Sequence, residues 1–178
     1  MKGKYEYSII GINDKIRDLH LNVKSDTKYI PEQYLLSSVG QRYELLRGLM
    51  DTDGCVYKNG EIEFSTSSEQ LSIDFLKLVR SLGIICKCYK KKTTHLPSYR
   101  IKLYTRAEIF KLRRKIDRLR KYDSPSFEKT ALIDIKESNI EDSICISVDN
   151  PSKLFIASEQ YIPTHNTYMV GVGIVLHQ

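Results

Sequence analysis

Two short segments of the sequence combine residue types that could carry out chemistry. The first reads DTDG at residues 51–54 and presents two carboxylates, Asp51 and Asp53, whose hard oxygens suit Mg²⁺. The second reads HNT at residues 165–167 and places an imidazole, a side-chain amide and a hydroxyl next to one another, which are the groups of an acid catalyst and a nucleophile. Motifs this short are usually ordinary turns, so the elements around them must decide what they do.

The first segment lies at the end of a predicted helix. Apolar residues at helical spacing predict that helix over residues 42–50, and Gly54 is expected as its left-handed C-terminal residue. Strands are predicted over residues 55–57 and 61–66, because the Asn-Gly pair at 59–60 between them is a strong hairpin motif.

The pattern then repeats with a second helix and a second pair of strands. Ser67, with Gln70 three residues later, predicts a capping box that opens a helix, and Gly83 ends it. Strands are predicted over residues 84–90 and 99–104. A final helix is marked by Ile109, Leu112, Ile116 and Leu119. The predicted order is αββαββα, and the fold class is α+β.

Different patterns flank this unit on both sides. A strand over residues 5–10 and a short helix over residues 14–20 are expected to be the tail of a preceding repeat. The Ser-Pro-Ser sequence at 124–126 indicates a boundary. Short β-rich segments follow at residues 131–136, 144–148 and 154–157.

Residues 46–54 read LRGLMDTDG, which resembles the LAGLIDADG motif of homing endonucleases, and the surrounding αββαββα order is that family's repeat. The resemblance implies that the helix packs through Gly48 against the helix of another repeat, and that Asp53 reaches Mg²⁺ at the scissile phosphates. Residues 28–36 are similar to the segment before the second motif of endonuclease domains carried inside inteins. Lys102 is the candidate for the lysine that the family keeps near its active site, and a solvated strand lysine is the alternative.

Basic residues are concentrated in the second half of this unit. Residues 100–121 contain ten basic and two acidic side chains, a local charge of +8, whereas the whole chain has a net charge of +6 and a pI near 9.0. Contact with the phosphates of double-stranded DNA and a solvated helix face are both typical of such a run. The candidate DNA-binding residues are Arg100, Arg106, Arg113, Arg114 and Arg118.

The C-terminal region resembles the end of an intein. The matching stretches read ICISVD at 144–149, LFIA at 154–157 and YIPTHNT at 161–167. The resemblance implies that Thr167 accepts the upstream host segment as a branched ester, and that Asn166 then cyclises to a succinimide and releases Thr167. His165 would donate a proton to the leaving amine. Cys145 stands where the common pattern has an Asp; it is either a thiol that relays the acyl group or a buried strand cysteine.

An intein begins with Cys or Ser and has a Thr-x-x-His segment downstream, and neither precedes the endonuclease-like repeat. We therefore expect an N-terminal intein fragment as partner, with this chain acting as the C-terminal fragment of a split intein or as a truncated product. Lys153, which stands where the pattern has a His, receives no role. The alternatives are a LAGLIDADG endonuclease or DNA-binding remnant that cuts double-stranded DNA with a partner repeat, and an inert remnant.

Three parts are therefore predicted: a partial LAGLIDADG domain at 1–122, the C-terminal strands of an all-β Hint splicing domain at 123–166, and host sequence at 167–178. The host segment is similar to the helix after a phosphate-binding loop, which favours a phage-type nucleotide-binding host such as a terminase or helicase. No apolar run approaches about 18 residues, and the four cysteines form no CxxC pair, so a membrane span, a disulfide scaffold and a zinc ribbon are not expected. We expect a cytoplasmic phage or bacterial protein that splices without a cofactor and needs Mg²⁺ only for DNA cleavage.

Overall fold

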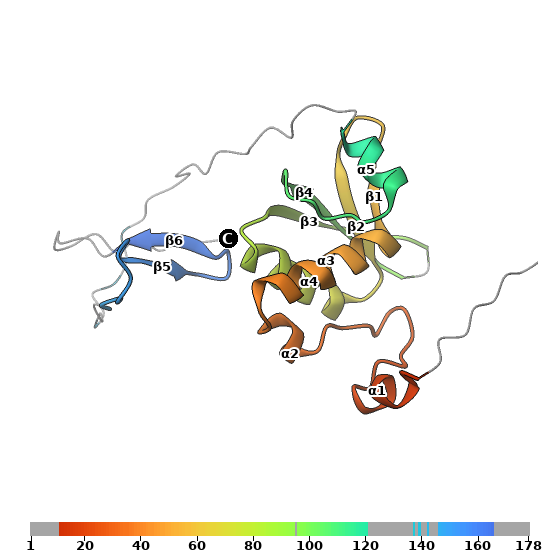
Figure 1. Ribbon diagram of the computed structural model, residues 1–178, viewed down its shortest axis with the longest axis horizontal. Coiled ribbons are helices and arrows are strands. Elements are labelled where there is room, and N and C mark those ends of the chain that lie inside the picture. The colour runs from red at the N-terminus through yellow and green to blue at the C-terminus, as the bar shows by residue number, and fades with distance from the viewer. Residues whose placement is uncertain are drawn as a thin grey trace, which may run out of the picture. The chain divides into compact units, whose positions relative to one another are not determined.

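A computed structural model describes residues 11–94, 96–120 and 146–165, with Glu137, Asn139 and Asp142; of Arg120 it describes the backbone. The chain separates into two compact units, Met1–Pro125 and Ser126–Gln178. Figure 1 shows the helices and the larger sheet of the first unit and the hairpin of the second. Within the described residues, the longest helix is too short and too polar to cross a membrane.

The first unit is built on a four-stranded antiparallel sheet in the order β1-β2-β4-β3, with α3 and α4 packed on one face (Figure 1). Two short helices precede it, α1 (Asn13–Asp18) and α2 (Glu32–Leu35). The elements that follow are α3 (Val39–Asp53), β1 (Gly54–Val56), β2 (Ile62–Thr66), α4 (Glu69–Ser81), β3 (Ile85–Lys91), β4 (Ser98–Tyr104) and α5 (Arg113–Arg120). This sequence of elements confirms the predicted αββαββα order.

The core lies between the sheet and the two helices. β4 alternates strictly, because every second residue is buried against the helices and the residues between them face the other side. Phe64 of β2 stacks on Phe75 of α4, with ring centroids 4.0 Å apart and planes 8° from parallel. Leu46 and Met50 contribute from α3 and are fully buried. One face of α3 is therefore fixed by core packing.

Gly54 does not have the predicted left-handed conformation. Its φ of −82° and ψ of 152° are those of an extended residue, and it is the first residue of β1. A Cβ atom placed on Gly54 would lie 2.5 Å from the Met50 carbonyl oxygen and 2.6 Å from Met50 Cε. The glycine is thus needed because the strand starts against the last helical turn and leaves no room for a side chain.

The N-terminal cap of α4 is Ser68, so the predicted capping box at Ser67 was wrong. The Ser68 hydroxyl accepts the backbone N–H of Leu71 at 3.1 Å. The Gln70 side chain does not return to the cap; its amide donates to Asp74 at 2.9 Å. Gly83 adopts a left-handed φ of 73° after the helix, as the sequence predicted.

The final helix begins later than its apolar residues suggested. Ile109 and Phe110 are buried in the segment before α5, and the helix starts only at Arg113. The backbone N–H groups of Lys111 and Leu112 donate to Asp51 at the end of α3, so this segment is tied to α3 before it becomes helical.

The second unit contains one described hairpin. β5 (Leu154–Ala157) pairs antiparallel with β6 (Ile162–His165), which confirms the strand predicted at 154–157. The strand predicted at 144–148 was wrong for its described residues 146–148, which have no regular structure. The strands predicted at 5–10 and 131–136 lie outside the described residues.

The Phe64–Phe75 pair gives a direct test of this core. We expect Phe64→Ala to lower the free energy of unfolding by about 3–5 kcal/mol, because it removes a fully buried ring and leaves a cavity. Leu36→Ala, at a residue that is 78% exposed, is the matched control and should change it by less than about 0.5 kcal/mol. Urea unfolding measures both values, and equal effects would contradict the described packing.

Candidate functional site

The three polar residues at the end of α3 have different surroundings. The Asp51 carboxylate accepts the backbone N–H groups of Lys111 and Leu112 at 3.1–3.2 Å. The Thr52 hydroxyl lies 3.1 Å from carbonyl oxygens one turn back in the same helix. Asp53, the last helical residue, is exposed, and its side chain makes no hydrogen bond or ion pair with any described residue, although the charge of Lys115 acts on it electrostatically. Asp53 is therefore the carboxylate of this motif that can bind a ligand.

Asp53 fits as one ligand of a Mg²⁺ ion and does not complete a site. Among the residues that the structure describes, no group of three or more His, Cys, Asp or Glu side chains could hold a metal. Mg²⁺ commonly takes one or two protein carboxylates and fills its remaining positions with water and substrate phosphates. The other ligands would have to come from outside the described part of this chain.

A lysine that the sequence did not single out lies against this helix end. The Lys115 ammonium donates to three carbonyl oxygens, those of Met50 at 2.7 Å, Asp51 at 2.8 Å and Gly54 at 2.6 Å. Burial lowers the pKa of the Lys115 amine below its ordinary value. Its partners are 61–65 residues away in the sequence, so no local pattern could have revealed the contact.

Lys102 lies on the face of the sheet opposite the helices. Its ammonium is 3.2 Å from both carboxylate oxygens of Glu61, and this hydrogen bond raises the pKa of Lys102. In the sheet register Lys102 is paired with Glu63 on one side and Lys87 on the other. Its predicted role near the active site stays a prediction.

Arg100 shares this outer face with Lys102, two residues away on β4. Its guanidinium is 3.7 Å from the Glu63 carboxylate, and the Tyr57 hydroxyl donates to the same carboxylate at 2.8 Å. Glu63 is only 7% exposed, and its charge raises the pKa of the Tyr57 hydroxyl through the hydrogen bond. The cluster of Tyr57, Glu63 and Arg100 was not foreseen from the sequence.

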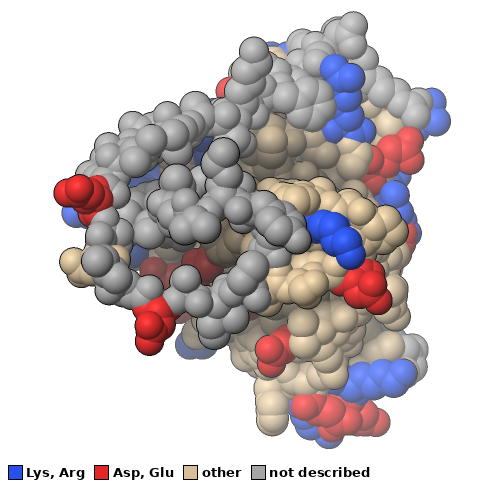
Figure 2. Space-filling view, turned by 90° about the vertical axis from the view of Figure 1, so that its left-hand side faces the viewer, with Lys and Arg blue, Asp and Glu red and all other residues tan. Residues whose placement is uncertain are grey.

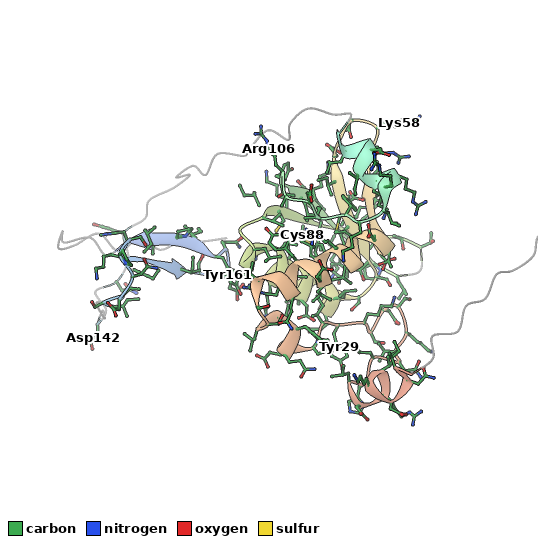
Figure 3. All side chains as sticks on the ribbon, viewed as in Figure 1. Tyr29, Lys58, Cys88, Arg106, Asp142 and Tyr161 are labelled. Atoms are coloured by element: carbon green, nitrogen blue, oxygen red, sulfur yellow. The ribbon has the colours of Figure 1, made fainter. Side chains whose placement is uncertain are left out.

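The other predicted DNA-binding arginines are spread over the first unit. Arg106 lies beyond the end of β4 and projects outward in Figure 3. Arg113 pairs with Asp117 on the same exposed turn of α5, at 2.9 Å. Arg118 donates to the carbonyl oxygen of Val56 at 3.1 Å, and Arg114 is exposed. On the face turned to the viewer in Figure 2, the described basic and acidic side chains are interspersed and do not form one basic patch.

The described end of the second unit reaches the first residue of the predicted splicing trio. His165 is the last residue of β6, is exposed, and lies opposite Leu154 of β5. Lys153 is a turn residue with a left-handed φ of 53°, and its ammonium donates to the carbonyl oxygen of Val148. The remaining predicted splicing residues, Cys145, Asn166 and Thr167, lie outside the described residues.

Comparison with known families identifies the element that contains Asp53. Residues 40–117 match the family model of a LAGLIDADG-like domain. This part of the chain is a LAGLIDADG-like domain. The match runs from the first turn of α3 into α5 and therefore includes the whole sheet of the first unit.

Two similar proteins extend this result. A replicative DNA helicase DnaB of Mycobacterium intracellulare is 33% identical over 148 residues, which cover 79% of this chain and 26% of the helicase. An uncharacterized protein of Methanocaldococcus jannaschii is 33% identical over 84 residues, which cover 43% of this chain and 9% of that protein. The chain thus spans only about a quarter of the helicase and about a tenth of the archaeal protein.

The Tyr57–Glu63 contact on the outer face can be tested by titration. We expect Glu63→Gln to lower the pKa of Tyr57 toward its ordinary value, because the carboxylate that favours the protonated phenol is lost. NMR of ring-labelled tyrosine follows Tyr57 as the pH is raised. Glu61→Gln, which removes a carboxylate held by Lys102 instead, should leave the Tyr57 titration unchanged. An unchanged titration in Glu63→Gln would contradict the described cluster.

Proposed function

We propose that this chain is the C-terminal part of an intein carried by a replicative helicase, and that it splices in trans with an N-terminal intein fragment. The extent of the helicase similarity supports this most strongly. A match to 79% of the chain is longer than its first 117 residues, so it continues past the LAGLIDADG-like domain wherever it starts. An intein explains why one similarity includes both an endonuclease-type domain and the segment after it.

The proposed chemistry uses three consecutive residues. The Thr167 hydroxyl attacks the ester or thioester that joins the upstream host segment to the N-terminal fragment, and it takes over that segment as a branched ester. The Asn166 side-chain nitrogen then attacks its own backbone carbonyl, which breaks the bond to Thr167 and forms a succinimide. His165, at the end of β6, donates a proton to the leaving amine. A final shift of the acyl group from the Thr167 oxygen to its nitrogen yields a normal peptide bond.

The described hairpin supports the need for a partner. Two paired strands are marginally stable alone in water, and apolar side chains of this hairpin are open to solvent. Leu154, Ile156 and Tyr161 are 43%, 57% and 36% exposed. An N-terminal fragment that completes the Hint β-fold would cover these residues, and it would also supply the acyl donor.

The host is proposed to be a helicase. The sequence pattern of residues 168–176 allowed a terminase or a helicase, and the similarity to a DnaB helicase favours the second. Residues 167–178 would then be the first host residues after the splice junction.

Splicing in trans can be tested with purified fragments. We expect the chain, mixed with an N-terminal fragment that carries the intein start, to give a ligated host product detectable by intact-mass spectrometry. Asn166→Ala should abolish the ligated product and stop at the branched ester, because no succinimide can form. Asn139→Ala, at an exposed residue of the same unit, is the matched control and should splice normally. Normal ligation by Asn166→Ala would contradict the proposal.

DNA cleavage is a second candidate function, and the exposed Asp53 carboxylate, which makes no described hydrogen bond or ion pair, favours it. In the LAGLIDADG-like domain the motif leaves this one exposed carboxylate without a described partner, and the outer sheet face carries Lys87, Arg100 and Lys102. Such a face could bind duplex phosphates, and Asp53 would hold Mg²⁺ against the scissile phosphate. A second motif from another chain or segment would supply the opposing carboxylate.

If the chain cleaves DNA, substitution of Asp53 should abolish DNA cleavage and leave DNA binding intact. In a complex with a partner motif, Asp53→Asn should abolish Mg²⁺-dependent cutting of a plasmid that carries the uninterrupted host gene. DNA affinity should persist, because the cations of the outer face and not the Asp53 carboxylate would contact the phosphates. Asp117→Asn, another exposed carboxylate of this unit, should cut normally. Gel analysis and fluorescence anisotropy give the two readouts, and cutting by Asp53→Asn at the normal rate would contradict the assignment.

A further inference from the structure

The end of α3 and the start of α5 are joined by contacts that run in both directions. From α5, the Lys115 ammonium donates to the carbonyl oxygens of Met50, Asp51 and Gly54. From α3, the Asp51 carboxylate accepts the backbone N–H groups of the two residues directly before α5. Each element therefore binds backbone groups at, or directly next to, the facing end of the other.

The Lys115 contacts replace the usual closure of a helix C-terminus. The last carbonyl groups of a helix have no partner within it, and they carry partial negative charge. A left-handed glycine commonly closes this end, but Gly54 is extended and starts a strand instead. One ammonium lies 2.6–2.8 Å from three carbonyl oxygens at this end: that of Met50, which also accepts the Gly54 N–H, that of Asp51, and that of the strand residue Gly54. The stem of Lys115 also brings this cation over the Phe110 ring, 5.6 Å from its centroid.

Asp51 binds the backbone directly before the facing helix, α5. The first N–H groups of a helix are unpaired and carry partial positive charge, which a carboxylate there stabilises. Asp51 uses both of its oxygens for the N–H groups of Lys111 and Leu112. Asp51 of α3 binds the backbone before α5, and Lys115 of α5 binds the end of α3. The loss of either side chain should therefore loosen the contact between these two segments.

We infer that Asp51 and Lys115 are positioning residues for Asp53: they hold the last turn of α3 so that the Asp53 carboxylate is presented in a fixed place. This inference rests on the second candidate function, DNA cleavage through Asp53. The Asp53 side chain makes no hydrogen bond or ion pair with a described residue, so its position is set mainly by the backbone that carries it. That backbone is held at Asp51 and Gly54, on both sides of Asp53.

The geometry assigns different tasks to the two aspartates of the motif. A metal-binding carboxylate must turn its oxygens toward the ion and the substrate phosphates. Those of Asp51 are directed at backbone N–H groups of the same unit. Asp51 therefore acts through Asp53 and does not share its metal.

Amide hydrogen exchange of the full chain tests the inference without DNA or metal. The N–H groups of Thr52, Asp53 and Gly54 close the last turn of α3 and report its opening. In Asp51→Asn and in Lys115→Met we expect their exchange to be roughly tenfold or more faster, because hydrogen bonds to a charged group are lost. Amide exchange at the core residues Leu78 and Ile101 should change far less if Asp51 and Lys115 act on the end of α3 and not on the stability of the whole unit. Asp117→Asn, whose carboxylate pairs with Arg113 on α5, is the matched control and should exchange like the unmodified chain.

A second readout follows the metal. Mn²⁺, used as a paramagnetic probe, should broaden the amide resonance of Asp53 in the unmodified chain. The broadening should be weaker in Asp51→Asn, and it should be lost at residue 53 in Asp53→Asn. Equal exchange at residues 52–54 in Asp51→Asn and the unmodified chain would overturn the inference, as would acceleration of equal size throughout the core. If exchange at residues 52–54 is faster in the variants but Mn²⁺ does not broaden the Asp53 resonance in the unmodified chain, the metal role of Asp53 would be wrong. The role of Asp51 and Lys115 in holding the end of α3 would still be supported.

Discussion

α3 passes into β1 without an intervening residue, and this junction constrains the rest of the first unit. Asp53 is the last helical residue and Gly54 the first residue of the strand, which lies so close to Met50 that only glycine fits. Met50 is itself fully buried, so core packing fixes the place where the helix ends. The exposed carboxylate of Asp53 is thus located by the hydrophobic core and by Lys115, and hardly by contacts of its own.

The two units differ in what they can do alone. The first has a continuous core between a four-stranded sheet and two helices, with a polar outer face where Arg100 and Lys102 lie among acidic partners. In the second, the described hairpin leaves Leu154 and Ile156 open to solvent. A LAGLIDADG-like domain with its own core, followed by a hairpin with exposed apolar residues, agrees with the intein proposal, in which a partner fragment covers the hairpin.

The sequence predicted those features that depend on local pattern and missed those that depend on distant contacts. The order of elements followed from periodicity and spacing, whereas the role of Asp53 rests on the resemblance of residues 46–54 to the LAGLIDADG motif and stays a prediction. The cap of α4 was misplaced by one residue, because Ser68 and not Ser67 also donates to the carbonyl oxygen of Lys28, which lies 40 residues earlier. Lys115 was indistinguishable from the other cations of a basic run, and only the fold shows that its ammonium caps α3.

The C-terminal bond between Asn166 and Thr167 is where the account can be tested most directly. The splicing product of this chain should end in a cyclic aminosuccinimide at Asn166, which makes it one water lighter than the same fragment with a free carboxylate. Intact-mass and tandem mass spectrometry of the excised fragment, after incubation with an N-terminal intein fragment, measure this end group. A succinimide at Asn166, with Thr167 at the start of the host product, is the predicted result. A cut at another bond, or a hydrolysed end at Asn166 from the first time point, would contradict the intein assignment.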